Sequence, residues 1–148
     1  MFQNNSADNP GCWSKIGRKG GIQKIQLSED GCYEKHLLTH EMMHAAGHHH
    51  EHTRSDRDQH IYVNFSCIMH GKEHIFEKRN NTETFGLPYD HYSIMHYSPR
   101  EYQRAINCKT MTSLNSQVPD YDIGLSTEMT DLDVKKILTM QQCTVPRK

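Results

Sequence analysis

Residues 40–50 decide how this sequence is interpreted, and they read His40-Glu41-Met42-Met43-His44-Ala45-Ala46-Gly47-His48-His49-His50. Seven of the chain's 12 histidines lie between His36 and His52. The stretch has the form H-E-x-x-H-x-x-G-x-x-H, and its first two histidines are four residues apart. On a helix this spacing places both imidazoles on one face, one turn apart, where they can bind the same metal ion. The spacing therefore predicts a zinc site that begins on a helix.

A catalytic zinc site needs a third protein ligand and keeps one position open. His48 is four residues beyond His44, but ligands on one straight helix would span roughly 12 Å from first to last. That is too far for one ion at Zn–N distances of about 2.0–2.1 Å. Gly47 allows the chain to turn sharply, so we expect His50 to be the third ligand. We expect His48 and His49 to be solvated.

Glu41 is the predicted general base. It lies beside the two helical histidines, where its carboxylate can reach a water molecule at the metal without itself becoming a ligand. Zinc lowers the pKa of such a water toward 7 and polarises a carbonyl group, and a carboxylate can pass the proton on to a leaving amine. We therefore expect one Zn²⁺ per chain and hydrolytic chemistry.

Hydrophobic periodicity predicts two strands and a helix in the first half of the chain. Residues 1–10 form a polar N-terminal segment that ends in a Pro-Gly pair. Short strands are expected at 12–16 and 22–27, followed by a loop at 28–31. A helix is expected over 33–46, and because its apolar residues cover most of the circumference, we expect it to be buried.

The second half of the sequence is expected to be mostly irregular. Residues 61–65 alternate as a strand does, and 67–92 are expected to be loops with a short helix at 73–78. Thr130 can cap a final helix, with Asp133 in the capping-box position. The apolar face of that helix is expected to be core, and it consists of Val134, Ile137 and Leu138.

Length and charge bound the class of protein. The chain has 148 residues, 17 Lys and Arg against 18 Asp and Glu, and a formal charge of −1. This suits one domain, and it offers no basic field to hold nucleic acid or an anionic membrane. No apolar run approaches the ~18 residues of a membrane span. The partners we expect are protein or peptide substrates, and the oligomeric state stays open.

Cysteines and sequons point to a secretory setting. Five cysteines occur in this short chain, with three Asn-x-Ser/Thr sequons at Asn4, Asn64 and Asn80. Such usage is typical of secreted proteins, although a three-residue sequon often arises by chance. The first ten residues lack the charged and apolar regions of a signal peptide. We expect a secreted, extracellular protein whose signal peptide is not part of this chain.

Residues 40–58, HEMMHAAGHHHEHTRSDRD, resemble the astacin signature HExxHxxGxxHExxRxDRD. Residues 93–97, SIMHY, are similar to the SxMHY Met-turn of that family of metzincin zinc endopeptidases. Three shorter upstream segments also resemble astacins, namely GCWS at 11–14, GRKGG at 17–21 and the pair Gly31-Cys32.

The resemblance implies an astacin-like zinc peptidase domain over 11–148. Its fold would be α+β and zincin-like, with a partial N-terminal sheet, a long active-site helix and a largely irregular C-terminal subdomain ending in a helix. The active-site cleft would lie between about 11–50 and 51–148. The opening strands and a backing helix of the family domain are expected to be absent from this chain.

Individual roles follow by the same resemblance. His40, His44 and His50 would ligate zinc, with Glu41 as general base. Tyr97 would be a displaceable ligand that stabilises the oxyanion, and Met95 the apolar floor below the metal. An edge strand would pair with an extended substrate, and this strand would consist of Cys12, Trp13, Ser14 and Lys15.

The resemblance also implies a disulfide between Cys12 and Cys32. Cys143 resembles the family's C-terminal cysteine, whose usual partner lies further upstream than this chain reaches. Cys67 and Cys108 have no clear family counterpart. Since the chain has five cysteines, at least one is left over or pairs with another chain.

The expected function is that of a zinc-dependent metalloendopeptidase. One alternative is a catalytically inactive pseudoprotease that retains zinc and binds extended peptides. Another is a histidine-rich metal-binding protein without a fixed site. In this family aromatic residues are usual at the positions of His48, His49 and His91, and we expect the histidines there to be solvated substitutions.

Overall fold

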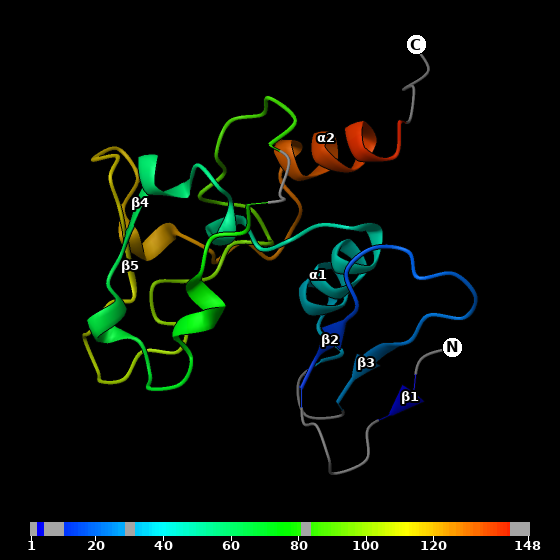
Figure 1. The fold of residues 1–148 in the computed structure, drawn as a ribbon, viewed down its shortest axis with the longest axis horizontal. Coiled ribbons are helices and arrows are strands. Elements are labelled where there is room, and N and C mark those ends of the chain that lie inside the picture. Colours follow the sequence, from blue (N-terminus) through cyan, green and yellow to red (C-terminus); the bar gives the residue numbers. More distant parts are fainter. Residues whose placement is uncertain (1–2, 5–10, 29–31, 81–83, 143–148) are drawn as a thin grey trace. The chain divides into compact units, whose positions relative to one another are not determined.

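The computed structural model describes residues 3–4, 11–28, 32–80 and 84–142, and it divides the chain into two compact units (Figure 1). One unit comprises residues 1–49 and 127–148, and the other residues 50–126. Both contain strands and helical turns, so the predicted α+β class is confirmed. No helix in the described ranges is long and apolar enough to cross a membrane.

The first unit contains a three-stranded sheet in the order β1-β3-β2, made of β1 (Gln3–Asn4), β2 (Trp13–Ser14) and β3 (Ile25–Leu27). β1 runs parallel to β3, and β2 runs antiparallel to it with Trp13 opposite Gln26. β2 is therefore an edge strand of this sheet. The predicted second strand is shorter than expected, because Ile22 is 88% exposed and lies outside β3.

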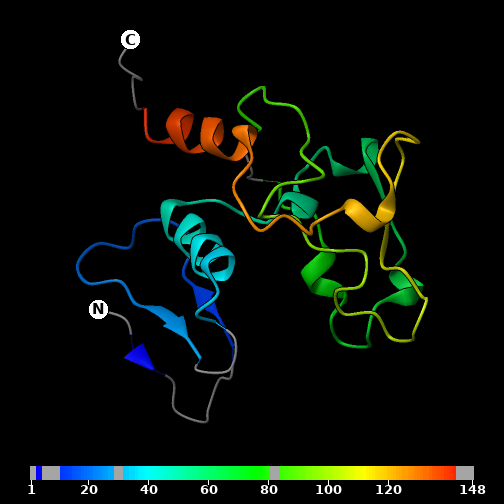
Figure 2. The same ribbon diagram turned by 180° about the vertical axis from the view of Figure 1, so that it is seen from behind.

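Helix α1 (Lys35–Ala46) packs against β2 and β3 (Figures 1 and 2). It ends as predicted at Gly47, whose φ of 115° places it in the left-handed region. The expectation that this helix is buried on most sides is wrong. Its buried side chains are Glu41, Met43 and His44, whereas Met42 is 54% exposed. The buried face is thus mainly polar.

Helix α2 (Asp131–Met140) begins at the predicted capping box. The Asp133 N–H donates to Thr130 Oγ1 at 3.0 Å, and the Thr130 N–H donates to Asp133 Oδ2 at 3.1 Å. After α2, the Gln141 side chain donates to the carbonyl of Ala46 at the end of α1 (3.0 Å). The predicted apolar core face is wrong in part, because Val134 is 41% exposed, Ile137 and Leu138 are only partly buried, and the buried side chains are Asp133 and Lys136.

The second unit is built around a two-stranded antiparallel sheet of β4 (Ile61–Val63) and β5 (Met111–Ser113). The described residues of this unit also form five short 3₁₀ helices: η1 (Glu51–Thr53), η2 (Arg57–Gln59), η3 (Phe65–Cys67), η4 (Glu73–Phe76) and η5 (Asp120–Asp122). Its core contains Ile61, Val63, Ile68, Phe76, Tyr89 and Met111. The predicted strand 61–65 ends early, since Phe65 belongs to η3 and is 46% exposed.

Two disulfides join described cysteines. One links Cys12 to Cys32, the pairing that the family resemblance implies, and the other links Cys67 to Cys108. The two bridges close loops with sequence separations of 20 and 41 residues. Cys143, the predicted loop tip at 29–31 and most of the polar segment 1–10 lie outside the described residues.

Candidate metal centre

Three histidines converge at the end of α1. His40 and His44 lie on that helix one turn apart, and His50 follows the left-handed turn at Gly47. One ring nitrogen from each of the three lies within 4.8 Å of the other two. Two nitrogens that each lie about 2.0–2.1 Å from one zinc ion are at most about 4.2 Å apart, so small rotations of these rings would bring the triad to zinc-binding distance.

The His44 ring is held in the tautomer that a metal ligand needs. Its Nδ1 donates to the backbone carbonyl of His48 at 2.7 Å, so Nε2 is the ring nitrogen whose lone pair a metal would bind. Burial lowers the pKa of His44 to about 4, so the ring is neutral near neutral pH. The three donors therefore fit zinc in type and arrangement, and His44 is in the neutral form that a ligand needs.

Glu41 is buried next to this triad. Its side chain is 5% exposed, and Oε2 has no hydrogen-bond partner among the described residues. Burial raises the pKa of Glu41 to about 7, and a backbone hydrogen bond with Ser14 opposes that rise. Ser14 belongs to the edge strand β2, so the carboxyl group lies close to the strand that was predicted to bind substrate.

The predicted Met-turn lies beside His50 within the second unit. The Tyr97 ring lies 4.4 Å from the His50 ring, centroid to centroid. Met95 is 1% exposed, and its carbonyl accepts from the N–H of Glu51, the residue after His50, at 2.9 Å. The Met95 N–H donates to the buried Ser93 Oγ at 3.0 Å. Tyr97 and Met95 are thus both placed near the third predicted ligand.

A chain of hydrogen bonds that the sequence did not reveal leads to Tyr97. His96 Nδ1 donates to the Tyr97 carbonyl at 2.6 Å, so its Nε2 can accept from the Tyr89 hydroxyl at 2.7 Å. Burial raises the pKa of Tyr89 well above its ordinary value, which keeps the hydroxyl protonated. Tyr89 and His96 are positioning residues for the Tyr97 main chain.

Arg54, the arginine of the signature at residues 40–58, links separate segments of the second unit. Arg54 donates to Glu51 Oε1 at 3.0 Å, and Glu51 Oε1 also accepts from the Asp90 N–H at 3.0 Å. Arg54 forms a two-pronged pair with Asp56 at 2.9 and 2.8 Å. It also donates to the carbonyls of Leu87 and Pro88. One buried guanidinium therefore ties the segment after His50 to the segment before the Met-turn.

The expectation of solvated histidines is wrong at two positions. His48 is 6% exposed and His91 is 8% exposed, while His49 is partly buried. His48 Nε2 is buried with no hydrogen-bond partner in the part of the chain that the structure describes. The charges of Lys136 and Asp133 on α2 both act on its ring, and burial lowers its pKa to about 4. These positions are interior, so imidazoles there are removed from water.

The predicted substrate strand lies at the sheet edge. Trp13 and Ser14 form β2, Cys12 precedes them in its disulfide, and Lys15 is exposed. β3 pairs with one side of β2, and β2 stands last in the order of the described strands. Its role toward a peptide remains a prediction.

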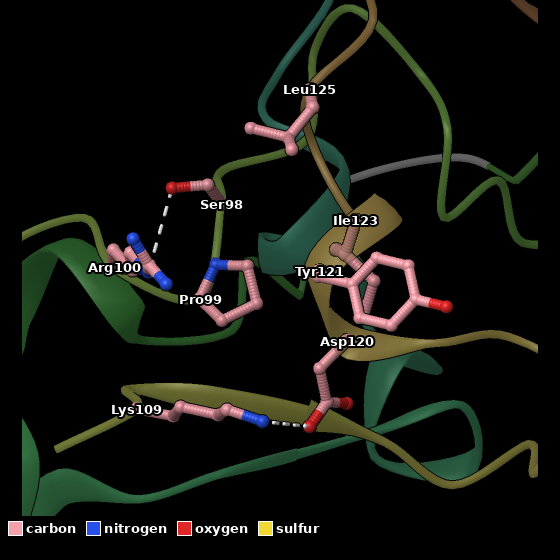
Figure 3. A pocket seen from close by; sticks show the side chains of 8 residues that line it. All are labelled: Ser98, Pro99, Arg100, Lys109, Asp120, Tyr121, Ile123 and Leu125. Carbon is pink, nitrogen blue, oxygen red and sulfur yellow. Dashed lines mark hydrogen bonds and ion pairs between the residues drawn. The ribbon is translucent and has the colours of Figure 1, made fainter. Parts of the chain in front are cut away.

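The second unit contains a hollow of about 250 Å³, which is lined in part by the segment directly after Tyr97 (Figure 3). It is lined by Ser98, Pro99, Arg100, Lys109, Asp120, Tyr121, Ile123 and Leu125. Lys109 pairs with Asp120 at 2.8 Å at one end, and Leu125 lies at the other. None of the predicted site residues is among these eight.

Comparison with known proteins defines the class. A solved structure of a hatching-enzyme zinc protease, high choriolytic enzyme 1 from Oryzias latipes, superposes with a TM-score of 0.87 at 34% identity, over 97% of this chain and 70% of that one. This match agrees with the α+β fold. The sequence model of the astacin peptidase family matches residues 2–142. The chain therefore belongs to the astacin family.

Curated relatives support the same membership. The chain is 38% identical over 133 residues to low choriolytic enzyme from Oryzias latipes, covering 90% of this chain and 48% of the relative. It is also 38% identical over 141 residues to astacin-like metalloendopeptidase from Gallus gallus, covering 94% of this chain and 33% of the relative. The chain thus spans between a third and half of the length of these relatives. In keeping with a family of zinc metalloproteases, His40, His44 and His50 could form a zinc site.

Proposed function

We propose that this chain is a secreted zinc-dependent endopeptidase acting on extended protein substrates, with His40, His44 and His50 as the ligands of one zinc ion. The observation that carries the proposal is the convergence of three imidazole nitrogens within 4.8 Å of one another. Family membership supports it, because the relatives are named metalloendopeptidases and choriolytic enzymes. The two disulfides suit an oxidising, extracellular setting.

When bound, zinc would supply a Lewis acid that polarises the scissile carbonyl and acidifies a water molecule. Glu41 then acts as the general base. Its Oε2 atom is buried and has no competing hydrogen bond from the described residues, so it can accept a proton and return it to the leaving amine. Because Glu41 immediately follows His40 on a helix, it stays close to the metal without being one of the three ligands.

Tyr97 provides the second catalytic group. Its hydroxyl would donate a hydrogen bond to the oxyanion that develops as the carbonyl is attacked, an interaction stronger in the transition state than in the ground state. The bond from His96 to the Tyr97 carbonyl limits where the tyrosine backbone can go. Met95 would form the apolar floor, a role its burial supports.

Cys12, Trp13, Ser14 and Lys15 would bind the substrate backbone. A strand at a sheet edge presents unpaired N–H and C=O groups, and an extended peptide can add to them as a further strand. The edge position of β2 supports this role. The Cys12–Cys32 disulfide would hold the strand in place during binding.

The test combines zinc stoichiometry with cleavage of an unfolded protein such as reduced casein. Wild type is expected to hold one zinc and to cleave until a chelator is added. Glu41→Gln should keep its zinc and lose about 10²–10⁴-fold in kcat/KM, the usual contribution of a general base. His44→Ala should lose the zinc. His70→Ala is the matched control, because that imidazole is fully exposed and outside the triad.

The outcomes separate the alternatives. One tightly held zinc and measurable peptide affinity without turnover would identify a peptide-binding pseudoprotease instead. Several weakly held ions, lost in proportion as any histidine is removed, would identify a histidine-rich metal-binding protein without a fixed site. Either result contradicts the proposed activity.

A further inference from the structure

The sequon Asn64-Phe65-Ser66 lies entirely in the described part of the chain, whereas the sequons at Asn4 and Asn80 extend outside it. It joins β4 to η3 at the surface of the second unit. Asn64 is partly buried, Phe65 is 46% exposed and Ser66 is exposed. A surface loop of this kind is where N-linked glycans are found in secreted proteins.

The Asn64 carboxamide is oriented by the third residue of its own sequon. The Ser66 hydroxyl donates to Asn64 Oδ1 at 2.7 Å, and the Ser66 N–H donates to the same oxygen at 3.2 Å. Nδ2 donates to Cys67 Sγ at 3.2 Å. A carboxamide nitrogen carries two hydrogens, and within the described residues only this one bond is found for Nδ2. One hydrogen is left for substitution.

An apolar hollow adjoins this residue. It has a volume of about 310 Å³ and is lined by Arg57, Asp58, Ile61, Tyr62, Val63, Phe65 and Leu114. Asn64 stands between two of the lining residues in the chain. Three of the lining side chains are large, apolar and exposed, namely Tyr62 (57%), Phe65 (46%) and Leu114 (57%). Exposed apolar side chains that gather around one hollow are typical of a surface that contacts a ligand or partner.

We propose that Asn64 carries an N-linked oligosaccharide whose inner sugars cover this apolar hollow. The covalent step joins Nδ2 to C1 of the first sugar and breaks the bond between C1 and the pyrophosphate of a lipid-linked oligosaccharide donor. The lipid pyrophosphate leaves, Nδ2 gives up one proton, and nothing is oxidised or reduced. The remaining Nδ2 hydrogen still serves the bond to Cys67.

A sugar on Asn64 suits the hollow in two ways, through its attachment beside the hollow and through its surface chemistry. A sugar attached at Asn64 lies next to Phe65 without any cost of bringing a separate molecule to the surface. The axial C–H groups of a sugar ring carry partial positive charge and suit the negative face of an aromatic ring. Asp58 and Arg57 in the lining offer polar groups for the sugar hydroxyls.

This inference rests on the proposed secretion but not on the proposed catalysis. The chain is therefore expressed behind a heterologous signal peptide in eukaryotic cells, and all of the translocated product is analysed. Treatment with peptide N-glycosidase in heavy-oxygen water converts a glycosylated Asn into labelled Asp, which peptide mass spectrometry locates. Label at position 64 is expected in wild type and in Ser66→Thr, and is expected to vanish in Ser66→Ala. An unlabelled Asn64 in both wild type and Ser66→Thr overturns the proposal, whatever the cleavage activity is.

The covering role has its own readout. Enzymatic removal of the glycan should lengthen retention on a hydrophobic-interaction column, and the same shift should be seen for Ser66→Ala. In Phe65→Ser, which keeps the sequon and removes the central exposed ring, the shift on deglycosylation should be clearly smaller. Equal shifts in wild type and Phe65→Ser would overturn the covering role.

Discussion

Gly124 lies directly against the main chain of Tyr97. A Cβ atom built on Gly124 would stand 2.5 Å from both the carbonyl carbon and the carbonyl oxygen of Tyr97, and 2.6 Å from the carbonyl oxygen of His96. The φ angle of Gly124 is +64°, in the left-handed region. Two independent constraints therefore require glycine at this position, and both bear on the placement of Tyr97.

We predict that Gly124→Ala lowers stability and displaces Tyr97. The left-handed φ should cost about 1–2 kcal/mol and the overlap a further ~1–3 kcal/mol. Denaturant unfolding should report the combined loss, and cleavage should fall while zinc remains bound. Gly86→Ala is the matched control, because Gly86 has φ +68° but no described atom within 4 Å of the position that a Cβ would occupy. Equal effects of the two substitutions would show that the contact with Tyr97 carries no energy.

Arg54→Ala should be among the most destabilising single changes in the second unit. It removes the guanidinium that pairs with Glu51, whose side chain is 5% exposed, and it removes the donors to two backbone carbonyls. Breaking a buried ion pair by removing one partner typically costs about 3–5 kcal/mol. The urea midpoint measures the loss. Arg104→Ala, at an exposed arginine, should stay within ~0.5 kcal/mol of wild type. A comparable loss in Arg104→Ala would contradict the prediction that the buried ion pair and hydrogen bonds of Arg54 carry this stability.

Asp56 should make stability depend on acid pH. Its hydrogen bonds from Arg54 lower the pKa of the carboxyl below the ordinary value of 3.8. The folded state thus binds fewer protons than the unfolded state in this range, so the stabilisation is present above pH 3.8 and is lost as pH falls through the folded pKa. Asp56→Asn should be less stable than wild type at pH 7, and the difference should shrink below about pH 4.

Free energies of unfolding at pH 7, 5 and 3 test this dependence. Asp122→Asn, at an exposed carboxylate, provides the comparison and should run parallel to wild type throughout. A gap between wild type and Asp56→Asn that stays constant with pH would contradict the assignment to Arg54.

Local signals in the sequence predicted the helices well. α1 ends at Gly47 and α2 begins at Thr130 because the left-handed turn and the capping box are decided by the residues themselves. The strands β1 and β5 were missed, since each has only two or three residues and exists through pairing with a distant segment. The histidine triad was predictable because its spacing is local.

The least predictable feature was which side chains are buried and which are exposed. Phe65 was expected in a strand but lies exposed in η3, while His48 and His91 were expected in water but lie in the interior. The usual burial preference of each residue type, with Phe inside and His more often at the surface, favours the opposite assignment in each case. The bond from Tyr89 to His96 joins residues seven apart in an irregular segment, where no periodic pattern marks it. Tertiary surroundings decide these positions.

His48 offers a substitution that should raise stability. Its ring is 6% exposed, and Nε2 has no hydrogen-bond partner within the described ranges. Burying an unsatisfied polar group costs about 1–3 kcal/mol, and a phenyl ring of similar shape has no such group. His48→Phe should therefore increase the free energy of unfolding at pH 7 by about 1–2 kcal/mol. Denaturant titration of the zinc-loaded and metal-free forms measures the change.

The zinc content should not change in His48→Phe, because His44 Nδ1 donates to the backbone carbonyl of residue 48 and not to its side chain. His70→Phe is the control for adding an aromatic ring, since His70 is fully exposed and should gain nothing. A loss of stability in His48→Phe, with His70→Phe unchanged, would mean that the buried imidazole is satisfied by water and that its polarity contributes to the packing of α1 against α2. Loss of zinc in His48→Phe would show that the side chain of residue 48, and not its backbone carbonyl, orients the His44 ring.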